Sequence, residues 1–179
     1  RLHTLVDGLT DEQFNWKPGE GRWSIAEIVH HLNKMASGYL FVLEERLSHS
    51  DIKPLGNRAL RHGWIGGQFV KAMRPDGRPL KTMPRMAPPP APGGQSDLRM
   101  SSLMDDLDDY TDRFVTLIGE AEGKAIDKVR ISSPFLKVMR LPIATFLDAL
   151  GQHALRHAGQ AEQVAQGPGF PISPGFLDE

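Results

Sequence analysis

One stretch of the sequence, residues 142–166, combines a strong helical pattern with histidines at positions where a helix normally places leucine. Its apolar residues recur at three- and four-residue spacing, which at roughly 100° per residue forms one stripe along a helix. Pro142 suits the first helical position, and Gly167 followed by Pro168 supplies a stop. The stretch therefore predicts one amphipathic helix that packs into the protein interior through Ile143, Phe146, Leu147, Leu150, Ala154, Ala161 and Val164.

His153 and His157 fall inside this stripe or at its edge, one turn apart, and Gln160 follows on the same side. A buried polar group that lacks a hydrogen-bond partner costs roughly 1 to 3 kcal/mol, so both rings need partners. Ring nitrogens at i and i+4 can reach one metal ion at about 2.1 Å. Hydrogen bonds to other core groups are the alternative, and a third ligand elsewhere in the chain would favour a metal.

A second helical pattern begins where Ser24 and Glu27 form a capping box, and it continues to about position 48. On the helical wheel His31 lies beside Met35 at the flank of the apolar stripe, whereas His30 points away from it. His31 is therefore the better candidate for a third ligand. Glu27, one turn before His31, could orient that ring, although its capping role already accounts for it.

Two further helices are predicted. Residues 2–9 are interpreted as the tail of a first helix that is truncated at Arg1, which leaves open whether residues precede it. A third helix runs from about Ser96 or Ser101 to Ala121, with the alternating spacing of a helical bundle. The acidic cluster near its start is expected to be a solvated face; it comprises Asp105, Asp106, Asp108 and Asp109.

The connections between these helices are long. Residues 49–95 form a Pro- and Gly-rich crossover, in which a short helix with Trp64, Ile65, Phe69 and Val70 is expected to pack back onto the domain and could cover a pocket. Residues 122–141 form a second connection, and residues 168–179 form an irregular tail. Residues 1–179 are thus predicted to be a single all-α domain, a four-helix bundle with long crossover connections after the second and third helices. Bundle interiors are where facing helices assemble metal sites.

Composition excludes several classes of function. The net charge is −1 and the Lys and Arg residues are scattered, so no nucleic-acid partner is expected. No apolar run approaches the roughly 18 residues of a membrane span, and no signal peptide is apparent. With no cysteine, histidine and carboxylates are the available metal ligands, and a cytoplasmic location is expected. His3 and His62 are expected at the surface.

Two motifs resemble those of the DinB/YfiT-like four-helix bundle proteins. Residues 23–32, WSIAEIVHHL, resemble the family pattern W-S-I-x-E-[IV]-x-x-H-L on the second helix. Residues 153–160, HALRHAGQ, resemble H-x-x-R-H-x-x-Q on the fourth helix. The resemblance implies that the three metal-binding histidines of the family correspond to His31, His153 and His157.

The same resemblance implies a divalent metal, zinc or nickel, held by three imidazoles with open positions, as in a catalytic site. It also implies a small-molecule substrate, a possible low-molecular-weight thiol co-substrate such as bacillithiol or mycothiol, and a homodimer. The sequence places no general base, which favours thiol transfer over hydrolysis. A non-catalytic bundle that binds a structural metal or a ligand is the alternative, and histidines that are merely hydrogen-bonded are a third reading. Glu27, Met35 and Gln160 are candidates for residues that surround the metal or line its pocket.

Overall fold

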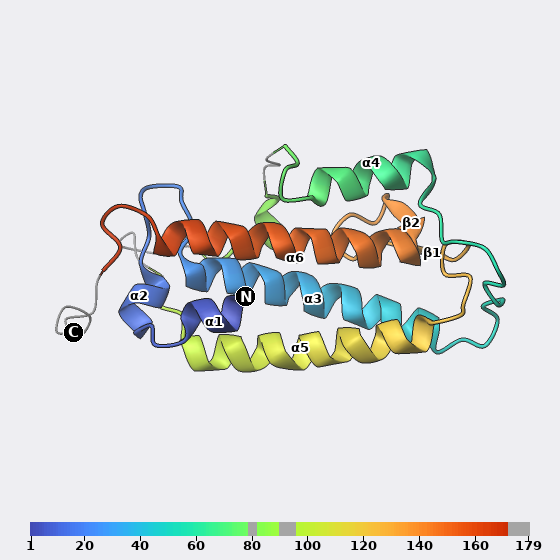
Figure 1. Cartoon of the computed structure of the whole chain (residues 1–179), viewed down its shortest axis with the longest axis horizontal. Coiled ribbons are helices and arrows are strands. Elements are labelled where there is room, and N and C mark those ends of the chain that lie inside the picture. The colour runs from blue at the N-terminus through green and yellow to red at the C-terminus, as the bar shows by residue number, and fades with distance from the viewer. Residues whose placement is uncertain (79–81, 90–95, 172–179) are drawn as a thin grey trace.

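The computed structural model describes residues 1–78, 82–89 and 96–171, and it consists mainly of helices (Figure 1). No helix in these ranges has both the length and the hydropathy that crossing a membrane requires. The elements in chain order are α1 (Leu2–Val6), α2 (Asp11–Asn15), α3 (Ile25–Leu47), α4 (Gly63–Met73), the 3-10 helix η1 (Pro84–Met86), α5 (Met100–Ala121), strands β1 (Arg130–Ser132) and β2 (Arg140–Pro142), and α6 (Ile143–Ala165).

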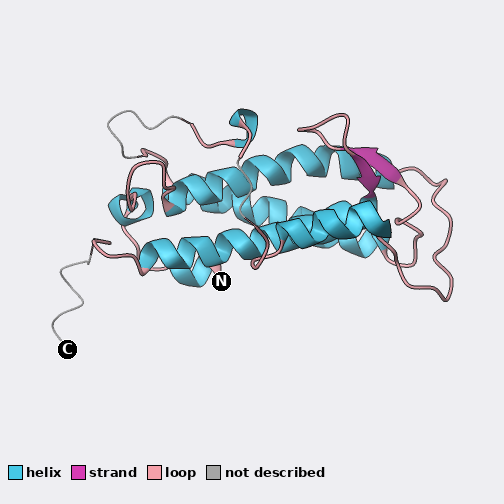
Figure 2. Cartoon of the chain, turned by 90° about the horizontal axis from the view of Figure 1, so that it is seen from above, coloured by secondary structure: helices cyan, strands magenta, loops and turns pink. Residues whose placement is uncertain are grey.

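The three long helices run side by side along the long axis of the molecule (Figure 1). Helix α3 contacts both α5 and α6, and α4 packs along α6. The view in Figure 2 places the small sheet at one end of these helices. Helices α3 and α6 therefore face one another along much of their length, and residues on their facing sides can meet.

Local sequence signals set the starts of two helices. Thr10 with Gln13 caps α2, and Ser24 with Glu27 caps α3, and in both capping boxes the two reciprocal hydrogen bonds are present. Each box satisfies backbone N–H groups that the first helical turn would otherwise leave without partners. The predicted capping box at Ser24 is confirmed, and it fixes the residue at which α3 begins.

The core divides into two clusters along the bundle axis. One cluster joins α1, α2 and the first half of α3 to α5 and the end of α6, and it includes Val6, Phe14, Ile28, Leu103 and Val164. The other joins the second half of α3 to α5, the start of α6 and the sheet, and it includes Tyr39, Leu43, Leu117, Ile131 and Phe146. The histidine positions lie between these two apolar regions.

The sequence predicted an all-α fold, and the described residues are mostly helical, but the second connection also contains a small two-stranded sheet. Strands β1 and β2 pair antiparallel, and Ile131 lies opposite Leu141 with both side chains buried. Strands of three residues are too short to produce a recognisable alternation in the sequence. Pro142 closes β2 and precedes α6 instead of occupying its first turn.

The short helix predicted in the crossover is confirmed as α4, but its expected packing is partly wrong. Phe69 packs against the core, whereas Trp64 and Ile65 face outward and are 80% and 66% exposed. Ala154, assigned to the buried stripe of the last helix, is also exposed. The expected tail over residues 168–179 lies outside the described residues from position 172 onward.

Candidate metal centre

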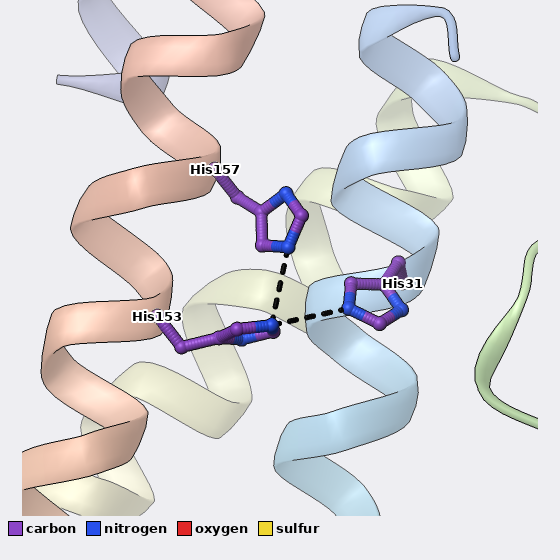
Figure 3. A group of neighbouring side chains, drawn as sticks. All are labelled: His31, His153 and His157. Atoms are coloured by element: carbon purple, nitrogen blue, oxygen red, sulfur yellow. Dashed lines mark hydrogen bonds between the residues drawn. The ribbon is translucent and has the colours of Figure 1, made fainter. Parts of the chain in front are cut away.

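Three histidines from two facing helices converge on one point (Figure 3). His31 projects from α3, and His153 and His157 project from successive turns of α6. Nε2 of His153 lies 3.1 Å from Nε2 of His157 and 3.4 Å from Nε2 of His31. Ligand atoms of all three rings lie within 4.8 Å of one another, and no further His, Asp or Glu of the described residues joins the group.

These separations suit coordination of one ion. Nitrogens about 2.1 Å from a common metal are roughly 3.0 to 3.4 Å apart in octahedral or tetrahedral geometry. The two measured separations fall within that interval. The helix positions produce this fit because His153 and His157 are one turn apart on α6, and α3 packs against that face of α6.

Hydrogen bonds on the far side of two rings fix where their lone pairs point. Nδ1 of His31 lies 2.7 Å from the carbonyl oxygen of Met86, which can only accept, so this nitrogen carries the hydrogen. Nδ1 of His157 likewise lies 2.9 Å from Oε1 of Gln160. In the neutral rings, Nε2 of His31 and His157 therefore presents its lone pair to the shared point.

Burial keeps the three rings neutral. Burial, together with the proximity of His157 and His31, lowers the pKa of His153 to about 3. Burial, followed by the proximity of His31, also lowers the pKa of His157 to about 4. The pKa of His31 is lowered by burial as well. Neutral imidazole is the form that binds metals, so the rings are ready to coordinate without first losing a proton.

The ring of Trp23 covers one side of the histidine group. It stacks on His157 at a centroid distance of 5.9 Å and an interplanar angle of 17°, and it lies 5.1 Å from the ring of His31. Trp23 immediately precedes the Ser24 capping residue, so the start of α3 positions the indole. The indole is therefore in van der Waals reach of two of the three candidate ligands.

A cavity of about 950 Å³ opens onto the histidines between α3, α4, α6 and the two connections. Five of the seven methionines of the chain line it, together with several aromatic rings. Its described lining contains no Asp, Glu or Lys. Its lining residues include Met35, Tyr39, Met73, Met83, Met86, Ser133, Phe135, Leu136, Met139, Phe146 and Gln160.

The other sequence candidates have the following positions. Met35 and Gln160 line the cavity. Glu27 is almost fully buried, and its carboxylate accepts hydrogen bonds from the backbone N–H of Ser24 and from Nζ of Lys17. His62 is only partly exposed, because it contacts α6 through Thr145 and Asp148.

Sequence reasoning missed two groups at this centre. The carbonyl of Met86 belongs to the backbone, and its contact with His31 carries no residue-specific signal. Trp23 belongs to the quoted motif, but a tryptophan before a helix gives no indication of which rings it will cover.

The chain matches the DinB superfamily model over residues 1–161, and it belongs to that superfamily. This confirms the resemblance carried by the two sequence motifs. Over 168 residues the chain is 24% identical to "Uncharacterized protein YuaE" of Bacillus subtilis (strain 168), a match that covers 93% of each chain. Over 31 residues it is 55% identical to "Putative metal-dependent hydrolase GK0616" of Geobacillus kaustophilus (strain HTA426), which covers 17% of each chain. No solved structure matches the chain.

Proposed function

We propose that the protein is a metal-dependent enzyme in which His31, His153 and His157 hold one divalent ion, zinc or nickel, beside a cavity for a small-molecule substrate. The observation that carries this proposal is the convergence of three Nε2 atoms at the edge of an apolar cavity. Membership of the DinB superfamily and the name of the Geobacillus kaustophilus relative support it. We also infer that α3 and α6 belong to a four-helix bundle completed by α5 and α1.

The donor set fits such an ion. Two of the three Nε2 atoms present lone pairs toward the shared point. A hydrogen on Nε2 of His153 can satisfy one of these lone pairs, whereas a cation accepts lone pairs from all three rings. Imidazole suits both zinc and nickel. Structural zinc sites usually have four protein ligands, whereas catalytic sites have three and an open position. A group of three histidines beside a cavity therefore favours a catalytic site over a structural one.

The residues of the cavity favour a thiol-dependent S-transfer over hydrolysis. When bound, a divalent ion supplies Lewis-acid chemistry and favours the ionised form of a thiol or water nucleophile. A thiol activated in this way needs no protein base, and no carboxylate or lysine lines the described cavity wall. Met86 and Gln160 hold the rings of His31 and His157 in place, and largely apolar side chains surround the space beside them. The relative named as a hydrolase supports hydrolysis as the competing reaction.

Elemental analysis tests the metal site. The protein is purified without a polyhistidine tag or chelator, beside His31→Ala, His157→Ala and the matched control His30→Ala, whose ring lies outside the histidine group. We expect close to one zinc or nickel per chain in the wild type and in the control, and a loss of metal in the other two variants. Retention of stoichiometric metal in both site variants would refute the assignment.

Activity assays separate the reactions. Conjugation of cysteine, bacillithiol or mycothiol to monochlorobimane reports S-transfer, and cleavage of p-nitrophenyl acetate reports hydrolysis. We expect the first activity to depend on the metal and to disappear in His157→Ala. A metal-loaded protein that is inactive with every thiol and ester would instead support a non-catalytic metal- or ligand-binding bundle.

A further inference from the structure

The cavity extends well beyond the histidines, along one face of α3. His31, Met35 and Tyr39 occupy positions i, i+4 and i+8 on this helix, and all three line the cavity. Eight residues correspond to a rise of about 12 Å. Tyr39 therefore lies at the end remote from the histidines, and a molecule that spans both ends must be elongated.

The turn between β1 and β2 builds the remote wall. Ser133, Phe135, Leu136 and Met139 of this turn line the cavity. The ring of Phe135 lies so close to Gly38 of α3 that an added Cβ would be 2.6 Å from it. The ring of Tyr39 is held by Phe146 at a centroid distance of 5.1 Å and by Phe135 at 5.8 Å. These contacts fix the position of the Tyr39 hydroxyl.

The hydrogen bonds around Ser133 indicate that the hydroxyl of Tyr39 can donate to a ligand. Oγ of Ser133 accepts from the backbone N–H groups of Phe135 and Leu136, each at 3.3 Å. A hydroxyl has two lone pairs and one hydrogen, so the hydrogen of Ser133 is directed to Oη of Tyr39, 3.0 Å away. We therefore assign Tyr39 as the acceptor in this pair, which leaves its own O–H free to donate.

The rest of the wall selects for apolar groups. Of the seven methionines, Met35, Met73, Met83, Met86 and Met139 line the cavity, and their flexible thioether side chains adapt to varied apolar shapes. Among the described lining residues, the charged ones are two arginines, Arg22 and Arg156. The guanidinium of Arg156 already donates to backbone carbonyls of Arg74 and Gly77. Arg22 and Arg156 adjoin Trp23 and His157 in the chain and so belong to the histidine end. A carboxylate or ammonium at the remote end would find no charged partner among the described lining residues there, and its burial would be costly.

We propose that the cavity binds an elongated, uncharged and largely apolar molecule whose remote end carries a hydrogen-bond acceptor such as a carbonyl, and that Tyr39 Oη donates to this acceptor. This proposal rests on the proposed function in one respect, because it takes the histidine end of the cavity as the place where the reaction occurs. Tyr39 then determines specificity at the far end, and the methionines determine it along the body of the molecule. Burial raises the pKa of Tyr39, which keeps the phenol protonated and able to donate at neutral pH.

A matched pair of probes tests the donor. The dissociation constants of 4-phenylbutan-2-one and butylbenzene, which differ in the carbonyl, are measured for the wild type, Tyr39→Phe and Tyr110→Phe. Tyr110 is the other tyrosine of the chain and lies on α5, outside the cavity lining. One hydrogen bond corresponds to a roughly threefold to tenfold change in affinity. We expect Tyr39→Phe to raise the dissociation constant of the ketone by that factor and to leave that of butylbenzene within about twofold. Tyr110→Phe should change neither dissociation constant. Equal effects on both probes, no effect on the ketone, or no saturable binding of either probe would overturn the proposal.

Methionine methyl groups locate the bound probe. In protein labelled with 13C at the methionine methyls, the ketone should shift the signals of the five cavity methionines and leave those of Met100 and Met104 unchanged. Shifts confined to Met100 and Met104 would place the probe elsewhere and refute the cavity assignment. The same experiment in His157→Ala separates the two proposals. If the metal-free variant still binds the ketone more tightly than butylbenzene, the result supports the cavity assignment alone. If the wild type holds stoichiometric metal but Tyr39→Phe does not weaken ketone binding, the result supports the metal centre alone.

Discussion

Nδ1 of His31 donates a hydrogen bond of 2.7 Å to the carbonyl oxygen of Met86, which joins a candidate metal ligand on α3 to the 3-10 helix η1 in the crossover. The two residues are 55 positions apart in the chain. The contact fixes the orientation of the imidazole and also gives the crossover segment a partner in the bundle. Occupancy of the centre and order in η1 should therefore be coupled.

Hydrogen exchange checks this coupling. Coordination at Nε2 of His31 polarises the opposite N–H and strengthens its bond to Met86. We expect zinc loading to slow amide exchange several-fold over residues 84–87, where the backbone N–H groups of Met86 and Ala87 already have helical partners. The central part of α5, residues 105–116, serves as the internal reference. Equal slowing of both segments would indicate general stabilisation instead of the specific contact.

Gln160 is expected to support metal binding through His157. Its Oε1 accepts from Nδ1 of His157 at 2.9 Å, and removal of such a partner typically costs 10- to 100-fold in metal affinity. Gln160→Leu should therefore weaken zinc binding by about that factor, as measured by competition with a chromophoric chelator. Gln152→Leu is the matched control, because Gln152 lies on the same helix and contacts Asp148 instead of a histidine. Similar affinities in the two variants would contradict a positioning role for Gln160.

The role of Glu27 can be decided by separating stability from metal binding. One carboxylate oxygen accepts from Nζ of Lys17 at 2.8 Å and the other from the backbone N–H of Ser24 at 2.9 Å, at a nearly buried position. Glu27→Ala leaves the largely buried Lys17 charge unpaired, which typically costs about 3 to 5 kcal/mol. We expect a loss of that order in urea unfolding, with zinc affinity changed by less than about threefold, while exposed Glu120→Ala changes neither. A tenfold loss of affinity at unchanged stability would instead assign Glu27 to the metal centre.

The sequence allowed the histidine positions to be predicted because helical periodicity relates residue number to direction. His153, His157 and His31 lie on or beside the apolar faces of long helices, so their spacing relative to the apolar residues indicated that they point inward. The contact between His31 and Met86 could not be predicted, because it depends on the path of a Pro-rich crossover that has no periodicity. The remote wall of the cavity could not be predicted either, because the strands on either side of the turn that contains Ser133 are three residues long and show no recognisable alternation of apolar and polar residues. The outward face of α4 with Trp64 shows that an apolar residue in a short helix does not have to be buried.

Two glycines near the cavity should respond in opposite ways to the same substitution. A Cβ on Gly77 would lie 2.7 Å from the carbonyl oxygen of Ala72 and 2.8 Å from the guanidinium of Arg156. Gly77→Ala must therefore displace the turn that Arg156 holds against α6, and a loss of about 1 to 3 kcal/mol is expected. Gly67 in α4 has open space around its Cβ position, so Gly67→Ala should stabilise the helix by roughly 0.5 to 1 kcal/mol. Urea unfolding of the two variants measures both effects, and a gain in stability for Gly77→Ala would show that the turn yields easily.

The pH dependence of stability should reveal the neutral histidines in metal-free protein. Burial lowers the pKa of His153 to about 3 and that of His157 to about 4, whereas an unfolded histidine titrates near 6.5. Between these values the unfolded chain binds more protons than the folded one, so the free energy of unfolding must fall as the pH is lowered from about 6.5 to 4. At about 1.4 kcal/mol per pKa unit, a loss on the order of a few kcal/mol is expected in chelator-treated protein. The double variant His153→Ala with His157→Ala should show a flatter profile over the same interval, measured by urea unfolding at each pH. Parallel profiles for the two proteins would mean that these rings are not held neutral in the folded state.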